Sequence, residues 1–323
     1  MTDGALRDRL DQTVSAIVAR ADATAALKDP QLAALARIAA DLRHYPGGAF
    51  KARLRASLQR RTAMTTALVT TGAREGFTTI TPYLRVREAA GLVGFLSRVF
   101  AAVETLSSTG RGGGRHHEVR IGNSMLMIDE GGPEGVIPLR PAEFHVYVED
   151  ADATFERALA AGATSLGQPA DRPYGERAGF VKDAYGNHWF IATHLGGSYV
   201  PEGLRTVTPF LHLQSAAAYI DFLKQAFGAV EEGRHEPSAE RVVYARLRIG
   251  NAVIELGEAD TQPMPGAFYL YVADADVLYE QALAAGAKSL WRPIDQPYGD
   301  RVGGVEDSSG NQWFIARPAQ QEP

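Results

Sequence analysis

The chain contains the same passage twice. Residues 173–192 read PYGERAGFVKDAYGNHWFIA, and residues 297–316 read PYGDRVGGVEDSSGNQWFIA. Three further pairs keep the same order, with offsets of 124 to 128 residues: TPYLRV at Thr81 and TPFLHL at Thr208, RIGN at Arg120 and at Arg248, ALAAGATSL at Ala158 and ALAAGAKSL at Ala282. Self-similarity at a fixed spacing indicates a duplicated domain. The fold must therefore be one that two successive copies can build.

Each copy divides again into two similar halves. A β-rich run precedes an apolar helical stretch, and two or three more β-rich runs follow; this order occurs twice in each copy. Asp150 or Asp152 can cap the helix that Gly162 ends, while Ser215 and Asp274 precede the two helices of the second copy. The pattern predicts an α+β fold of four βαβββ modules, with one domain at 76–197 and the other at 204–318.

Residues 1–72 have a different pattern, which predicts a small helical extension. Leucine and isoleucine recur at helical spacing after Asp29-Pro30, and a Pro-Gly-Gly sequence ends the stretch. The next segment, AFKARLRASLQRR, is basic on one side. A solvated helical hairpin accounts for it, and a basic amphipathic helix that binds an acidic partner or a membrane surface is the alternative.

Composition excludes several classes of function. The 323 residues include no cysteine, so disulfides and thiolate chemistry are impossible. The net charge is −5, although the first 72 residues carry 11 Lys and Arg against 6 Asp and Glu. The remainder is therefore acidic, which argues against a nucleic-acid partner. The charged start resembles no signal peptide and no stretch has membrane-spanning length, so we expect a cytoplasmic protein without a membrane partner.

The second half of each copy resembles a known family. It contains V-x-D-x-D, then A-x-x-A-G-A, a Gly-x-Arg loop and D-x-x-G-x-x-W, in VEDADATFERALAAGA…YGERAGFVKDAYGNHW and VADADVLYEQALAAGA…YGDRVGGVEDSSGNQW. This resembles the glyoxalase/bleomycin-resistance branch of the vicinal oxygen chelate superfamily. The resemblance covers residues 76–318 and implies two domains of that superfamily, which hosts many chemistries.

The resemblance also implies where a metal would bind. In the family's metalloenzymes each module supplies one ligand from its first strand and one from its last, usually His or Glu. The matching positions here are Thr81, Met127, Glu143 and Phe190 in the first copy, and Thr208, Glu255, Ala267 and Phe314 in the second. One carboxylate per copy does not hold a divalent cation. We therefore predict no cofactor, with a divalent metal as the alternative.

Two arrangements keep that alternative open. A shifted site could use Glu143, His145 and His116, because residues two apart on a strand share a face. Modules could also pair across the two copies and bring Glu143 and Glu255 into one cleft.

Side chains on the same strand faces are the candidate ligand contacts. The cleft of the first copy should present Tyr83, Arg85, His116, Glu118, Glu143, His145 and Tyr147, and the cleft of the second should present Phe210, His212, Tyr244, Arg246, Glu255, Tyr269 and Tyr271. Arg177 and Arg301 lie in loops where a guanidinium could clamp an anion or bond to loop carbonyls. The aromatic residues either line a cleft for a flat ligand or fill a closed core.

Three functions remain in competition. The leading hypothesis is metal-independent binding or sequestration of a small, aromatic molecule, with antibiotic resistance of the bleomycin-binding kind as its sharpest form. The rival is a metal-dependent lyase, isomerase or dioxygenase, in which His116, Glu143 and His145 act as ligands or acid–base groups. The third is an interaction platform to which the N-terminal helices recruit a protein.

Overall fold

The computed structural model describes residues 69, 73–74, 76–109, 113–130, 139–237, 241–258 and 263–319. All of them belong to one compact unit, residues 62–323. Except for Val69, the helical extension predicted at 1–72 lies outside the described residues. None of the described helices has the length and hydrophobicity needed to span a bilayer.

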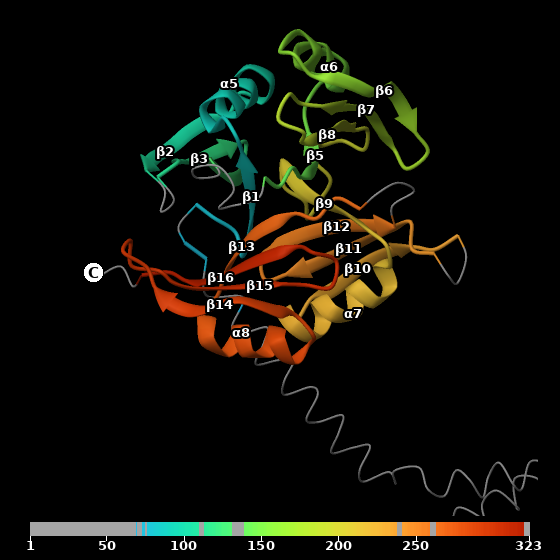
Figure 1. The fold of residues 1–323 in the computed structure, drawn as a ribbon. Coiled ribbons are helices and arrows are strands. Elements are labelled where there is room, and N and C mark those ends of the chain that lie inside the picture. Colours follow the sequence, from blue (N-terminus) through green and yellow to red (C-terminus); the bar gives the residue numbers. More distant parts are fainter. Residues whose placement is uncertain are drawn as a thin grey trace, which may run out of the picture. The chain divides into compact units, whose positions relative to one another are not determined.

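Four βαβββ modules follow one another along the chain, as the sequence predicts (Figure 1). Module 1 contains β1 (Ile80–Val86), α5 (Ala89–Phe100), β2 (Val103–Thr109), β3 (Arg115–Ile121) and β4 (Ser124–Glu130). Module 2 contains β5 (Glu143–Tyr147), α6 (Ala151–Ala160), β6 (Thr164–Arg172), β7 (Glu176–Lys182) and β8 (His188–His194). Module 3 contains β9 (Val207–Leu213), α7 (Ala216–Phe227), β10 (Val230–His235), β11 (Tyr244–Ile249) and β12 (Ala252–Glu258). Module 4 contains β13 (Ala267–Tyr271), α8 (Ala275–Ala284), β14 (Lys288–Asp295), β15 (Arg301–Glu306) and β16 (Gln312–Arg317).

The sheets exchange modules between the two copies. Sheet I has the strand order β14-β15-β16-β13-β1-β4-β3-β2 and joins module 1 to module 4. Sheet II has the order β10-β11-β12-β9-β5-β8-β7-β6 and joins module 3 to module 2. The joins are antiparallel, β1 with β13 and β5 with β9. Each eight-stranded sheet therefore takes half of its strands from each copy.

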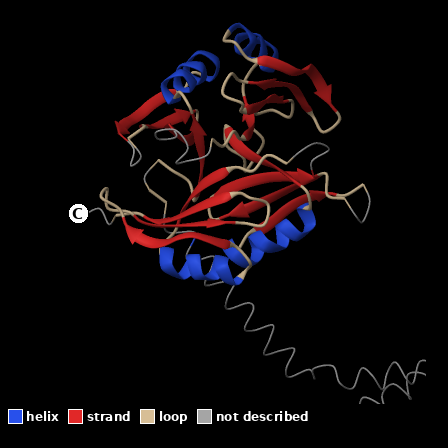
Figure 2. Ribbon diagram, viewed as in Figure 1, coloured by secondary structure: helices blue, strands red, loops and turns tan. Residues whose placement is uncertain are grey.

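The helices, in contrast, stay with their own copy. Helix α5 packs against α6, and α7 packs against α8 (Figure 1). The strands lie between these two pairs of helices (Figure 2). One apolar core lies beneath α5 and α6 and another beneath α7 and α8. Alternation along each strand supplies these cores: Leu84 and Val86 of β1 point to the helix side, whereas Tyr83 and Arg85 point to the other.

The duplicated RIGN sequence explains how the copies are fastened together. The Asn251 Oδ1 atom accepts hydrogen bonds from the backbone N–H of Thr79, at 2.8 Å, and from its hydroxyl, at 3.0 Å. Asn123 does the same for Thr206, at 2.9 and 3.2 Å. Each asparagine sits in the hairpin turn of one copy and holds the start of the first strand of the other copy. We call these two contacts the asparagine clamps.

The long repeated passage is mainly architectural. In the turn before β8, a carboxylate oxygen of Asp183 accepts from the Trp189 indole N–H at 2.9 Å, and the other accepts from the Asn187 backbone. Asp307 and Trp313 repeat this arrangement at 2.8 Å. Asp150 and Asp274 cap α6 and α8 through their side chains, as predicted. The D-x-x-G-N-x-W sequence thus ties a tight turn to a buried tryptophan.

Candidate functional site

The polar residues of both sheets gather on the faces turned away from the helices, which we call the inner faces. On sheet II, β5 contributes Glu143, His145 and Tyr147, since Phe144 and Val146 enter the core beneath α5 and α6. On sheet I, the corresponding strand β13 contributes Ala267, Tyr269 and Tyr271. Each inner face combines side chains from both copies because each sheet does.

A histidine held between two carboxylates is central to the inner face of sheet II. The Nδ1 atom of His145 lies 3.1 Å from Glu255 Oε2, and its Nε2 atom lies 3.2 Å from Glu176 Oε2. Tyr147 donates its hydroxyl to Glu176 at 3.0 Å, and Tyr244 donates to Glu255 at 2.7 Å. The two phenol hydroxyls therefore bind the outer oxygens of the two carboxylates that flank the imidazole, in one buried network of ion pairs and hydrogen bonds.

This network keeps His145 charged. Burial alone would lower its pKa, but the negative charges of Glu255 and Glu176 outweigh burial and raise the pKa to about 9. Because His145 is only 8% exposed, solvent screens these interactions weakly. An imidazolium at neutral pH can donate a proton or attract negative charge.

A second cluster on sheet II surrounds Glu143. Its Oε2 atom lies 3.2 Å from Nδ1 of His188 and 3.3 Å from Nδ1 of His212. Burial by itself would raise the pKa of Glu143, yet the hydrogen bonds to the two histidines hold it below the ordinary value. Glu143 is thus a carboxylate that two imidazoles stabilise in its ionised form.

The inner face of sheet I has its own charged histidine. His116 Nδ1 lies 3.0 Å from Asp129, and its Nε2 lies 3.9 Å from Glu118. Burial would lower the pKa of His116, but both carboxylates raise it to about 9. Arg74 also bonds to Glu118, and Tyr83 donates to Asp129 at 2.6 Å.

Aromatic rings fill much of the remaining inner face of sheet I. Tyr83 meets Phe314 edge-on with ring centres 5.2 Å apart, and Tyr269 lies 6.3 Å from Tyr83. Trp291 stacks on Phe314 at 5.5 Å and is 40% exposed. Tyr269 and Tyr271 are both buried. This face therefore has an aromatic interior with an exposed indole at its margin.

The predicted grouping of residues into clefts is wrong. Phe210, His212, Tyr244, Arg246 and Glu255 lie in sheet II, whereas Tyr269 and Tyr271 of the same copy lie in sheet I. Likewise, Tyr83, Arg85, His116 and Glu118 lie in sheet I, and Glu143, His145 and Tyr147 lie in sheet II. The shifted metal site is also wrong, because its His116 is on a different sheet from Glu143 and His145. The reason is that β1 pairs with β13 and not with β5 of its own copy.

The alternative of pairing across copies is the one observed. Glu143 of β5 and Glu255 of β12 both lie beside Phe210 of β9, one on each side. The face assignments within single strands hold as well: His116 joins the inner face, while the adjacent His117 points to the opposite face and contacts Glu104 at 2.8 Å.

Arg177 and Arg301 are structural contacts of the helices. Arg177 forms a bidentate pair with Asp152 in the first turn of α6 and lies 3.1 Å from Asp171. Arg301 binds Asp276 of α8 and Asp295 in the same way. Both lie on the helix side of their sheets, so neither is placed as an anion clamp on an inner face.

Three members of the histidine–carboxylate clusters were not predicted from the sequence: Asp129, Glu176 and His188. His188 occupies the variable position of G-N-x-W, where the other copy has Gln312, and Glu176 corresponds to Asp300. A comparison of the copies at such differing positions would have singled both out.

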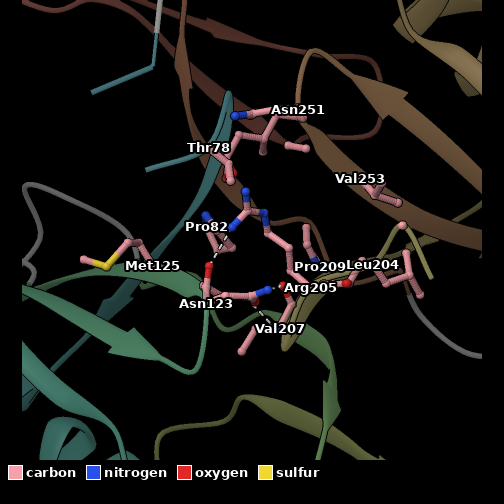
Figure 3. A pocket seen from close by; sticks show the side chains of 15 residues that line it. Thr78, Pro82, Asn123, Met125, Leu204, Arg205, Val207, Pro209, Asn251 and Val253 are labelled. Atoms are coloured by element: carbon pink, nitrogen blue, oxygen red, sulfur yellow. Dashed lines mark hydrogen bonds between the residues drawn. The ribbon is translucent and has the colours of Figure 1, made fainter. Parts of the chain in front are cut away.

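A cavity of about 260 Å³ lies where the two copies meet (Figure 3). Its lining comes from the starts of β1 and β9 and from the two hairpin turns, and includes Thr78, Asn123, Arg205 and Asn251. Arg205 donates to the Asn123 carbonyl oxygen at 2.7 Å. The cavity thus adjoins both asparagine clamps, and none of the charged residues of the inner-face networks lines it.

The positions that the family resemblance assigns to metal ligands do not fit a resident metal ion. On sheet I they are Thr81, Met127, Ala267 and Phe314, which offer neither a carboxylate nor an imidazole. On sheet II, Glu143 and Glu255 are present but already bonded to histidines. Within the described ranges, no three His, Asp or Glu side chains are arranged to hold a metal. A divalent ion held by protein usually needs three or four such ligands.

Comparisons with known proteins agree with this architecture. The chain belongs to the Glyoxalase/Bleomycin resistance protein/Dioxygenase superfamily, whose family model matches residues 79–191 and 211–315. Uncharacterized proteins of Mycobacterium bovis and Mycobacterium tuberculosis are 34% identical over 128 residues, which is 36% of this chain and 84% and 75% of theirs. A variant of glyoxalase I from Zea mays has a similar fold, with a TM-score of 0.60 and 13% identity over 79% of this chain and 96% of that one.

Proposed function

We propose that the protein binds a small organic molecule at an inner face without a resident metal ion, and that the molecule is aromatic. The observation that carries the proposal is the replacement of the ligand set: sheet I has hydroxyl, thioether, methyl and phenyl groups at all four positions. Aromatic rings beside a few fixed charges suit a flat ligand with one or two polar anchors. The most specific version of this proposal is that the protein sequesters an antibiotic of the bleomycin kind.

The test uses the full chain purified without chelator. Metal content is measured first, and we expect it to be substoichiometric. A thermal-shift screen against aromatic antibiotics and aromatic metabolites follows, with every hit confirmed by calorimetry. Tightly bound stoichiometric metal would overturn the proposal, as would a screen in which no aromatic compound raises the melting temperature.

An enzyme is the second candidate, and the environment of His145 favours it. A buried imidazolium between Glu255 and Glu176, beside the Tyr147 hydroxyl, has the composition of a general acid for a lyase or isomerase reaction. Proton NMR of a metabolite mixture incubated with the protein would reveal turnover. Turnover that is lost in His145→Ala and retained in His212→Ala would favour the enzyme over passive binding.

A further inference from the structure

The two inner faces are built on one plan and differ at a buried carboxylate. On sheet II, Glu143 lies beside His188, and its carboxylate joins His188 to His212. On sheet I the corresponding position is Ala267, which lies beside Gln312 in the same register. The methyl group of Ala267 leaves that position of sheet I without an acceptor.

The groups near Ala267 include two guanidiniums as well as the carboxylates of Glu306 and Asp129. Arg85 occupies the position that His212 has on sheet II. The isolated backbone β-bridge between Arg85 and Arg140 corresponds to the one between His212 and Met264. Sheet I thus has two guanidiniums where sheet II has one imidazole and a thioether. Of these two guanidiniums, Arg140 pairs with Glu306 at 3.1 Å, whereas Arg85 lies beside Asp129 in the strand register and forms no ion pair with it among the described residues.

Arg85 is poorly compensated among the described residues. It is 5% exposed, its Nη2 atom donates to the neutral amide oxygen of Gln312, and its Nε atom has no hydrogen-bond partner. The terminal nitrogens of Arg140 donate to the Glu306 carboxylate at 3.1 Å and to the Gly310 carbonyl oxygen at 2.6 Å. The Nε atom of Arg140 also has no hydrogen-bond partner. Arg140 therefore has a counterion in Glu306, whereas Arg85 has no ion pair among the described residues, and a buried charge that lacks a counterion is costly.

The electrostatics agree with this geometry. Burial lowers the pKa of Arg85, and the nearby charge of Arg140 lowers it further, although Tyr83 and Asp129 act in the opposite direction. An anion beside the Arg85 guanidinium would raise the pKa of Arg85 and so oppose the lowering that burial causes. Bidentate pairing of guanidinium with carboxylate is among the strongest hydrogen-bonded arrangements in proteins.

The surroundings specify what should carry the anion. The Arg85 guanidinium lies 5.3 Å from the Phe314 ring centre and 5.9 Å from that of Tyr83. Trp291 stacks on the same Phe314 and is 40% exposed, so the aromatic cluster extends from the buried Arg85 to the exposed margin of the sheet. We propose that the inner face of sheet I binds an aromatic carboxylate, whose carboxylate group supplies to Arg85 the anionic partner that Glu143 supplies to the histidines of sheet II. This inference rests on the proposed function and narrows its ligand.

The probes are benzoate, its neutral analogue benzamide and the cation benzylamine, each titrated calorimetrically into the full chain. We expect benzoate to bind at least about tenfold more tightly than the other two. Arg85→Gln should remove this preference, whereas Arg87→Gln, the same change at an exposed arginine two residues away, should leave it intact. Ala267→Glu should supply an internal carboxylate, raise the melting temperature and block benzoate.

Each result discriminates. Equal binding of benzoate and benzamide overturns the inference and leaves the proposed function standing, because an aromatic ligand still binds. Absence of binding by all three, together with an empty aromatic screen, rejects both. Benzoate binding that persists in Arg85→Gln overturns the inference even if Ala267→Glu proves unable to fold.

Discussion

At the scale of single residues, the charged histidines are the feature that most affects how the protein responds to pH. His145 and His116 each lie between carboxylates, and both have a pKa raised to about 9. A histidine outside such an environment has a pKa of about 6.5. Folding therefore increases proton binding at both sites, so protonation and stability are linked.

The sign of this linkage gives the first prediction. The contribution of His145 to stability is fully present below about pH 6.5 and is lost as pH rises through about 9. The free energy of unfolding should fall over that interval by on the order of 2–3 kcal/mol for this residue. Urea titrations followed by tryptophan fluorescence between pH 6 and 10 would measure it. His145→Gln should reduce the fall in stability and leave the part that His116 contributes, and a wild-type profile that is already flat would contradict the assignment.

Within a strand, residue positions were predictable, but their partners were not. Alternation along β5 placed Glu143, His145 and Tyr147 on one face, and the structure confirms this. Glu176 reaches His145 from β7, and Glu255 reaches it from β12 of the other copy. No local rule in the sequence relates His145 to either residue.

At the scale of elements, turns and caps follow local chemistry. Asp150 accepts from the Ala153 N–H at 2.9 Å, and Asp274 accepts from those of Asp276 and Val277. These bonds satisfy backbone donors that the first turn of a helix leaves unpaired. Asp152, the alternative cap, pairs with Arg177 instead.

The asparagine clamps give the second prediction. Asn251→Ala removes the acceptor for the backbone N–H of Thr79, a residue that is 1% exposed. An unsatisfied buried donor costs about 1–3 kcal/mol, so the free energy of unfolding should fall by that amount. Asn251→Asp, the control, keeps an oxygen acceptor and should cost less. Equal destabilisation by both substitutions would show that the acceptor is not what matters; chemical denaturation measures each value.

At the scale of the whole described unit, the duplication combines exchanged strands with helices that remain in their own copy. Ile80, at the start of β1, enters the core beneath α7 and α8, and Val207, at the start of β9, enters the core beneath α5 and α6. Each copy therefore contributes to both sheets and both cores. The two copies should behave as one cooperative unit.

Cleavage of the link between the copies tests this cooperativity. A protease site inserted between Gly197 and Ser198 falls in an exposed stretch outside the strands. After cleavage, the two fragments should elute together in size-exclusion chromatography and unfold in one urea transition, because each sheet needs both. Fragments that separate in native buffer, each still folded, would contradict the exchange of modules.

The sequence by itself determined the module order, the strand faces, the caps and the residue types at the metal positions, since repeats and alternation are local properties. Only the tertiary structure decided which modules share a sheet. The edge of β1 can hydrogen-bond through its backbone to β5 or to β13, and the duplicated sequences make those two edges nearly equivalent. The choice between them comes from packing over the whole unit. It places Glu143 with Glu255, and Arg85 with Gln312, and so decides what each inner face can bind.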